Sequence, residues 1–231
     1  MQAYSFLLIH GFGGGLWELA PLEKDLVQLG HLCHSVKLPG HDEQGRITST
    51  VDVEDFGATV LKAYDLLKKD RLPLVVIGFS MGALLAAWLA TVRNPEKIIL
   101  INTPIHIGQP NAVLHWLQQD WKHKDTKYTR ILISNAFRQR PDRNLLFLAV
   151  RKRYLPALQH VDVPVFLAQS FWDETVQLRS IKKAMEYLPN PPEMVKHYAN
   201  SRHHLCDGPD FPLFLQDLLQ FIEQPHSIRT P

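Results

Sequence analysis

Five consecutive residues, Gly78-Phe79-Ser80-Met81-Gly82, carry the clearest indication of chemistry in this 231-residue sequence. The motif follows an apolar run typical of a buried strand, Pro73–Ile77, and precedes one typical of a buried helix, Ala83–Ala90. A tight strand-to-helix turn holds such a serine in a strained conformation with its hydroxyl above the sheet, and side chains in place of the two glycines would collide with the neighbouring strand and helix. The N–H groups at the start of the helix favour negative charge at the same place. This context indicates a nucleophilic serine rather than an ordinary Gly-Ser turn.

The elements that would hold Ser80 are predicted by short apolar runs that alternate with helical periods. The expected strands are Tyr4–Ile9, Leu32–Lys37, Leu74–Ile77, Lys97–Ile101, Val163–Ala168 and Met194–Tyr198. The expected helices are Leu16–Leu29, Val53–Lys69, Met81–Val92, Val176–Tyr187 and Phe211–Glu223. Because strands separated by helices imply right-handed crossovers, we expect an α/β fold with a mostly parallel sheet and helices on both faces.

The composition is that of one globular domain. A hydrophobic content of 45% is ample for a core and excludes global disorder. The two cysteines, Cys33 and Cys206, provide neither a disulfide framework nor a closely spaced pair for zinc or redox chemistry. The N-terminal residues lack the basic region and the apolar stretch of a signal peptide, so a reducing, cytoplasmic location is expected.

Two features that suggest other classes of protein have simpler explanations. Residues 72–92 contain no charged side chain, as a membrane-spanning helix would, but the serine motif divides them into a strand and a helix, and a strand covered on both faces is also apolar throughout. His31 and His34 lie on an expected strand, where residues three apart point to opposite faces, and no carboxylate cluster completes a set of metal ligands. We therefore expect no integral membrane segment, no metal and no other cofactor.

Two loops follow the first two expected strands: His10-Gly11-Phe12-Gly13-Gly14 and Leu38-Pro39-Gly40-His41. Together with the serine motif, they match the HG-x-x-G loop and the P-G-H turn of the α/β-hydrolases, which nearly the whole chain resembles. Small bacterial carboxylesterases and monoacylglycerol-lipase-like enzymes are the members that it resembles most. The resemblance implies an oxyanion hole formed by the backbone N–H groups of Phe12 and Met81. It also implies about six strands, since two strands that often precede the HG loop are missing here.

In this family the acid and the base follow the nucleophile in the order Ser, acid, His. The stretch QSFWDETV after the fifth expected strand resembles the family's G-x-x-D-x-x-V, which implies Asp173 as the acid, with Glu174 as the neighbouring alternative. The stretch NSRHH after the sixth resembles the loop of the carboxylesterase group and implies His203 as the base. His204 remains the alternative, because the acidic residue and the proline that usually follow stand earlier than expected for either histidine.

Residues 105–160, between the fourth and fifth expected strands, form a helical stretch that no strand interrupts. The resemblance implies a helical cap there, inserted into a core of residues 1–104 and 161–224 and followed by a tail at 225–231. From Lys122 to Arg153 the sequence has ten Lys or Arg and two Asp, as a solvated outer face or a site for an anionic partner would have. The aromatic residues expected to shape an apolar acyl pocket are Trp116, Trp121, Phe137, Phe147 and Trp172.

Together these features predict a serine hydrolase that cleaves carboxylic esters of short-to-medium acyl chains. Ser80, His203 and Asp173 would form its triad, and the reaction would pass through an acyl-enzyme intermediate. The expected partner is a small-molecule acyl ester, not a nucleic acid, and the sequence leaves the oligomeric state open. The alternatives are a thioesterase, a carbon–carbon hydrolase or an acyltransferase on the same scaffold and, from a different class, a non-catalytic small-molecule receptor.

Overall fold

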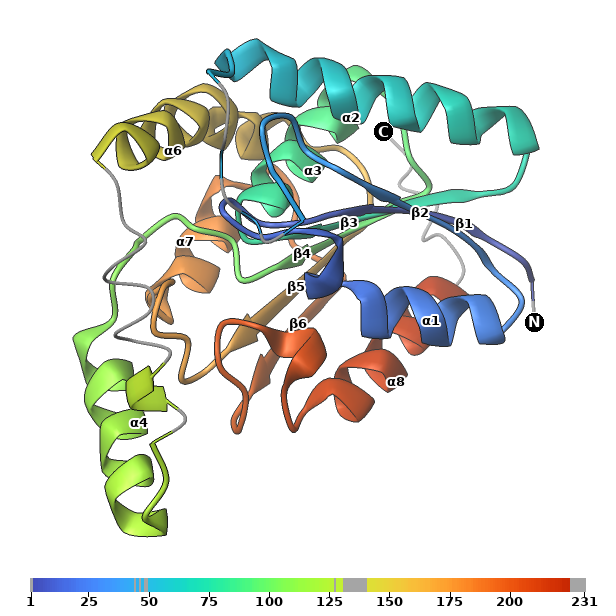
Figure 1. Ribbon diagram of the computed structural model, residues 1–231. Coiled ribbons are helices and arrows are strands. Elements are labelled where there is room, and N and C mark those ends of the chain that lie inside the picture. The colour runs from blue at the N-terminus through green and yellow to red at the C-terminus, as the bar shows by residue number, and fades with distance from the viewer. Residues whose placement is uncertain are drawn as a thin grey trace.

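The computed structural model describes residues 2–43, 45, 47, 50–126, 128–130 and 141–224. Phe137 and the tail at 225–231, both named above, lie outside this part of the chain. In the described part, a single parallel sheet of six strands forms the centre of the molecule (Figure 1). The strands are β1 (Ser5–Ile9), β2 (Leu32–Val36), β3 (Leu74–Phe79), β4 (Lys97–Ile101), β5 (Val165–Ser170) and β6 (Met194–Tyr198). The predicted fold class and strand number are confirmed.

The strands are ordered β2-β1-β3-β4-β5-β6, and each neighbouring pair is parallel. The order changes direction at β1, because the chain first adds β2 on one side and then β3 on the other. At such a point two loops leave the carboxyl ends of adjacent strands and diverge, and a crevice opens between them. The register pairs Ile9 with Gly78, so that the HG loop after β1 and the serine turn after β3 begin side by side.

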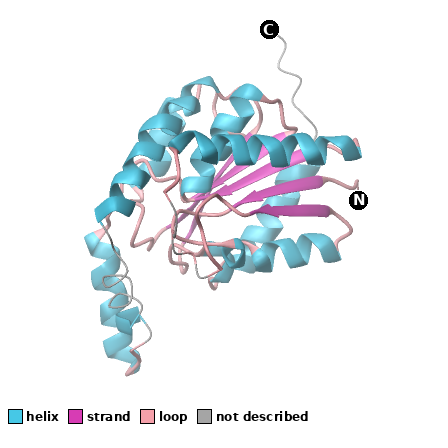
Figure 2. Ribbon diagram, turned by 45° about the horizontal axis from the view of Figure 1, so that its top comes forward, coloured by secondary structure: helices cyan, strands magenta, loops and turns pink. Residues whose placement is uncertain are grey.

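Helices cover both faces of the sheet (Figure 2). On one face, α1 (Ala20–Gln28) and α8 (Phe211–Glu223) pack on alternate strand residues such as Phe6 and Leu8. On the other face, α2 (Val53–Leu67), α3 (Met81–Val92) and α7 (Arg179–Tyr187) pack on the intervening residues, such as Leu7 and Ile9. The central strands are therefore buried on both sides, as their unbroken apolar runs predict.

Several predicted boundaries differ from the structure, and three of the differences have an identifiable local reason. The helix expected over 16–29 is divided into a 3-10 turn, Leu16–Glu18, and α1, which begins with Pro21 in its first turn. Strand β5 begins at Val165, directly after Pro164, which has no backbone N–H to donate to a sheet. The helix expected from Val176 begins only at Arg179, because Val176 forms an antiparallel bridge with Ile107 and the N–H of Gln177 donates to the carbonyl of His106 at 2.8 Å.

Helix α3 explains the uncharged stretch at 72–92. Ala- and Leu-rich along its length, it lies buried between the sheet and its neighbours α2 and α6 (Pro141–Tyr154). No helix in the described part of the chain is long and apolar enough to cross a membrane.

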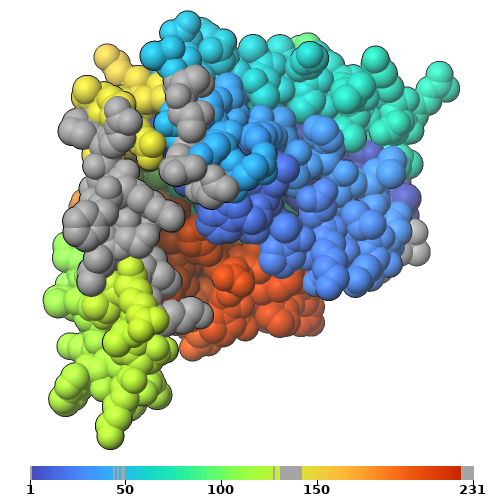
Figure 3. All heavy atoms as spheres, viewed as in Figure 1, coloured from blue at the N-terminus to red at the C-terminus, as the bar shows by residue number. Residues whose placement is uncertain are grey.

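In its described residues, the segment between β4 and β5 contains two long helices with different surroundings. The C-terminal half of α6 buries Val150 and Tyr154 against the core, and a 3-10 helix, Leu155–His160, continues from it. Helix α4 (Pro110–His123) instead extends away from the body of the molecule, as the space-filling view shows at its lower edge (Figure 3). Of its 14 residues only Ala112 and Asp120 are buried.

Candidate active site

The turn after β3 places Ser80 at the carboxyl edge of the sheet. Its φ of 53° and ψ of −119° lie in a strained, left-handed region, which the backbone hydrogen bond from its N–H to the carbonyl of Ile101 (2.8 Å) helps to hold. A Cβ at Gly78 would lie 2.2 Å from the carbonyl oxygen of Gly82, and one at Gly82 would lie 2.1 Å from that of Ile9. Both glycines are therefore required by the close approach of helix α3 to the sheet.

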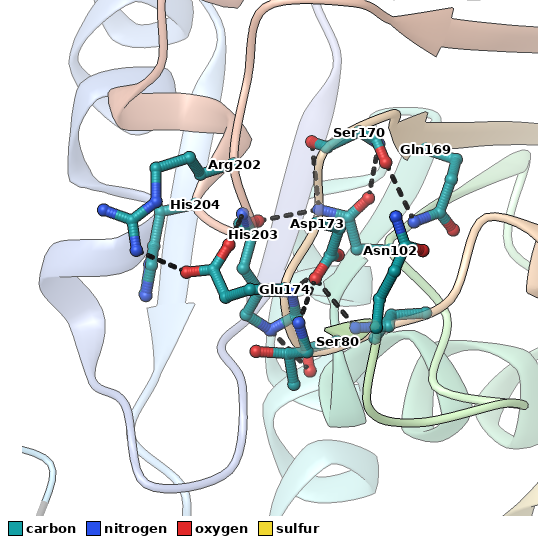
Figure 4. Close-up of polar contacts among 12 residues, drawn as sticks. Ser80, Asn102, Gln169, Ser170, Asp173, Glu174, Arg202, His203 and His204 are labelled. Carbon is teal, nitrogen blue, oxygen red and sulfur yellow. Dashed lines mark hydrogen bonds and ion pairs between the residues drawn. The ribbon is translucent and has the colours of Figure 1, made fainter. Parts of the chain in front are cut away.

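Three predicted residues from separate loops meet at this turn (Figure 4). The Nε2 atom of His203, on the loop after β6, lies 3.2 Å from the Oγ atom of Ser80. Its Nδ1 atom lies 2.8 Å from an Oδ atom of Asp173, on the loop after β5. The three side chains thus form a hydrogen-bonded chain from hydroxyl to imidazole to carboxylate, in which the imidazole is held from both sides.

Asp173 is fully buried, and its second oxygen is also fixed. That oxygen accepts hydrogen bonds from the backbone N–H groups of Thr175 and Val176, both at 2.8 Å. The carboxylate therefore organises its own loop while it orients His203.

The ionisation of His203 depends on its buried neighbours. Burial acts to lower its pKa, but the charge of Asp173 and the hydrogen bond to it outweigh this effect and raise the pKa above the usual value. Glu174 and Glu18 act in the same direction. The site is therefore built to stabilise a positive imidazolium, which forms when the imidazole takes a proton from the hydroxyl.

The alternatives to the acid and the base lie elsewhere. Glu174 directs its carboxylate to Arg202 (2.5 Å) and accepts a longer hydrogen bond from the backbone N–H of His203 (3.3 Å). His204 stacks on Trp17, with ring centroids 5.2 Å apart, and burial lowers its pKa to about 3. The geometry therefore brings Asp173 and His203, not their neighbours, to Ser80.

The two backbone N–H groups predicted to form the oxyanion hole come from the segments that follow β1 and β3. Phe12 follows β1 and Met81 begins α3, and neither backbone N–H donates a hydrogen bond to another described residue. The P-G-H turn supports the loop of Phe12: the Nε2 atom of His41 accepts the N–H of Gly13 at 3.0 Å. The Nε2 atom of His10 in turn accepts the N–H of Leu38 at 3.0 Å. The two motifs thus form one hydrogen-bonded unit.

One residue of the site, Asn102, was not predicted. It directly follows β4 with a φ of 49°, is fully buried, and donates from its amide to the carbonyl of His203 at 2.7 Å. Its amide oxygen accepts the N–H of Ser170 at 2.7 Å. Asn102 thereby ties the loop of the base to the end of β5. The only hint in the sequence is a polar residue directly after a buried strand.

The predicted pocket aromatics are divided between different environments. Phe147 packs against Phe12, with ring centroids 5.5 Å apart, and so reaches the HG loop. Trp116 donates its indole N–H to the carbonyl of Trp172 at 2.8 Å. Trp121 is 86% exposed, so the structure does not support its prediction as a wall of the acyl pocket.

A surface pocket of about 520 Å³ lies beside Trp172. It is lined by residues 108–111, at and just before the start of α4, and by residues 171–172 and 177–179, and Ser80 is not among its lining residues. The side chain of Trp172 stacks on His115, with ring centroids 3.8 Å apart and planes 4° apart. Trp172 therefore helps to fix α4 to the loop of Asp173.

Other side chains that could carry out chemistry, such as histidine and cysteine, have structural roles. The His31 ring accepts the backbone N–H of Tyr4 at 3.3 Å, and among the described residues no group of three or more His, Cys, Asp or Glu side chains could hold a metal. Cys206 is buried, which raises the pKa of its thiol. A thiol of this kind is inert as a nucleophile.

Comparisons with known proteins cover nearly the whole chain. The model of the alpha/beta hydrolase family matches residues 6–225. The chain is 22% identical over 226 residues to a carboxylesterase of Bacillus subtilis (strain 168), covering 94% of this chain and 92% of that protein. It is 25% identical over 228 residues to a thermostable monoacylglycerol lipase of Bacillus sp. (strain H-257), covering 93% of this chain and 88% of that protein. Among solved structures, a soluble variant of monoglyceride lipase from Saccharomyces cerevisiae matches with a TM-score of 0.70 at 19% identity, covering 95% of this chain and 86% of that one.

Proposed function

The chain belongs to the alpha/beta hydrolase family, and we propose that it is a serine esterase that cleaves carboxylic esters of short-to-medium acyl chains. The observation that carries this proposal is the chain of contacts from Ser80 through His203 to Asp173, at 3.2 and 2.8 Å. The names of the two Bacillus relatives, a carboxylesterase and a monoacylglycerol lipase, support ester substrates. The half-buried Phe12 and Phe147, in contact with each other, support an apolar acyl chain.

In the proposed reaction, the Ser80 oxygen attacks the ester carbonyl while the Nε2 atom of His203 takes the hydroxyl proton. The tetrahedral oxyanion is stabilised by the backbone N–H groups of Phe12 and Met81. His203 then gives its proton to the leaving alkoxide, and the acyl group remains on Ser80. A water molecule, deprotonated by His203, releases the carboxylic acid and restores the serine. Asp173 stays ionised throughout and holds the imidazole in its productive orientation.

The helical cap predicted at residues 105–160 would contribute to this reaction by shaping the acyl pocket with its inner surface. The basic residues of that segment provide less support for an anionic substrate than their number suggests. Arg151 donates to the backbone carbonyls of Pro104 and Ile105, and Arg143 donates to that of Ile47 at 3.2 Å. These guanidinium groups fix the segment to the core. We therefore favour an uncharged ester over an anionic thioester, and hydrolysis rates of matched esters and thioesters would compare the two.

Substitution of the nucleophile tests the proposal. Ser80→Ala should lower kcat on p-nitrophenyl acyl esters by at least about 10⁴-fold, because the triad acts as a unit. A fluorophosphonate probe should label the wild type, with the modified residue mapped to Ser80 by mass spectrometry. Ser35→Ala is a suitable control, since Ser35 lies on β2 and its hydroxyl donates to Glu23 at 2.6 Å. Equal hydrolysis by the wild type and Ser80→Ala would contradict the assignment.

A further inference from the structure

A buried carboxylate outside the three proposed catalytic residues, that of Glu18, lies directly beneath the HG loop. Glu18 ends the 3-10 turn that follows this loop, and its side chain is 5% exposed. One carboxylate oxygen accepts the backbone N–H of Gly11 at 2.8 Å. Gly11 directly precedes Phe12, whose N–H is the proposed oxyanion donor. Glu18 therefore fixes the peptide adjacent to this donor.

The glycines of the loop leave space for this carboxylate. A Cβ at Gly14 would lie within 2.3 Å of three Glu18 carboxyl atoms, and a Cβ at Gly11 would lie 3.2 Å from one of the oxygens. The chain thus bends around Glu18 with no side chain between them. The run of glycines is therefore explained by close packing on Glu18 as well as by a need for flexibility.

The same carboxylate reaches the loop of the base. Its other oxygen lies 3.6 Å from the Nδ1 atom of His204, the residue next to His203. Phe79, which immediately precedes Ser80, packs against both histidines, with ring centroids 4.8 Å from His203 and 5.5 Å from His204. Glu18 is therefore in contact with the loop of an oxyanion donor and with the loop of the base.

We propose that Glu18 is a positioning residue for the esterase reaction, which holds the N–H of Phe12 in place through Gly11 and sets the HG loop against the loop of His203. This inference rests on the proposed function. In this role Glu18 does not touch the substrate but keeps the HG loop and the loop of His203 in fixed relative positions.

The charge of Glu18 gives the proposal a second consequence. Burial raises its pKa to about 7, while the hydrogen bond from Gly11 and the charge of His203 act in the opposite direction. His204 and Cys206 are also close, but burial lowers the pKa of His204 to about 3 and raises that of Cys206, so both are uncharged near neutral pH. His203 is thus the neighbour whose charge changes together with that of Glu18. An ionised Glu18 favours the imidazolium form of His203.

Three variants test the proposal: Glu18→Ala, Glu18→Gln and, as a matched control, Glu23→Gln in the next turn of the chain. Glu18→Ala should lower kcat by about 10- to 100-fold with little change in KM, because the oxyanion exists only after substrate binding. A trifluoromethyl ketone, which forms an oxyanion on Ser80, should lose affinity by a similar factor. Glu18→Gln keeps an oxygen to accept the Gly11 N–H, so it should retain more activity. In Glu18→Gln, the fall of kcat/KM on the acid side should move to lower pH, because the negative charge that favours the imidazolium of His203 is lost. Glu23→Gln should leave all of these quantities unchanged.

A purely structural role would lower the melting temperature of Glu18→Ala and leave the kinetic constants of its folded fraction as in Glu23→Gln. That result would overturn the proposal. A rise in KM by the same factor as the loss of affinity for the ketone would overturn it too. If Glu18→Ala does not fold, an unshifted pH profile in a folded Glu18→Gln would overturn it equally. Because Ser80→Ala tests the proposed function separately, an inactive Ser80→Ala together with unchanged Glu18 variants would reject this inference alone.

Discussion

The carboxyl edge of the sheet and helix α4 differ in how completely their side chains are held. At the sheet edge, Asp173 is fully buried and both of its carboxylate oxygens accept hydrogen bonds. On α4, Trp121 is 86% exposed and Leu114 is 57% exposed. The first region thus has one well-determined arrangement of groups, whereas the second presents large apolar side chains to solvent.

This difference teaches that the two regions meet different physical demands. A transition state is stabilised by groups whose directions are fixed before the reaction, so each must be held by several partners. An apolar ligand requires surface and volume, which leave the choice and orientation of side chains far less restricted. Arg202 joins the two regions: it pairs with Glu174 at 2.5 Å, and its guanidinium lies 5.6 Å from the centre of the Trp116 ring on α4.

Asp173→Asn should produce the largest effect and thereby test the first region. An asparagine amide cannot replace the charge that holds His203, and we expect kcat to fall by about 10⁴-fold, or about 5 kcal/mol in the barrier. Glu174→Gln is the matched control on the adjacent residue and should cost far less. Steady-state kinetics on one ester check both. A greater loss in Glu174→Gln would reverse the assignment of the acid.

The same variant should change the pH profile. The activity requires a neutral His203, so wild-type kcat/KM should fall as the pH drops through the raised pKa of His203. Because Asp173 is the main cause of that increase, the acid limb of Asp173→Asn should move to lower pH. An unmoved acid limb would show that another group controls the ionisation.

Tyr154→Ala should give the next largest effect, on stability. Tyr154 is 2% exposed, and its hydroxyl bonds to the N–H of Gly57 (3.1 Å) and the carbonyl of Val53 (2.9 Å). Loss of the buried ring should lower the free energy of unfolding by about 3–5 kcal/mol. Tyr154→Phe, which keeps the ring, should cost about 1 kcal/mol. Urea denaturation measures both, and equal values would mean that the ring is not packed as described.

Trp121→Ala is the counterpart in the same inserted segment and should have the smallest effect. With its side chain 86% exposed, its loss should change the free energy of unfolding by less than about 0.5 kcal/mol. Hydrolysis of a short acyl ester should also stay at the wild-type rate. A stability loss close to that of Tyr154→Ala would remove the contrast between α4 and α6.

Most of the sheet could be predicted, because a strand buried on both faces needs a continuous apolar run, and such runs are visible without partners. The ends of elements were harder to predict. They depend on contacts from distant residues, as when the bridge between Val176 and Ile107 delays the start of α7. Local patterns contain no record of such contacts.

The site follows the same rule. Ser80 could be predicted because its strain requires glycines at fixed spacing, and the resemblance indicated Asp173 and His203 from their own loops. Asn102 and Glu18 have no such pattern around them. Each acts by hydrogen bonds to backbone groups far away in the sequence, His203 for Asn102 and Gly11 for Glu18. The direction of Trp121 could not be predicted either, because helical spacing alone does not say which face of α4 meets the core.

The parallel sheet has one further consequence, for the handling of the protein. Since all six strands run in one direction, the loops around Ser80 leave one edge, and the returning connections lie at the opposite edge. Lys69, Asp70 and Pro191 are exposed in connections of that second kind. A linker or a surface attachment at these positions would leave the substrate side of the molecule facing outward, so the protein could be immobilised in a known orientation.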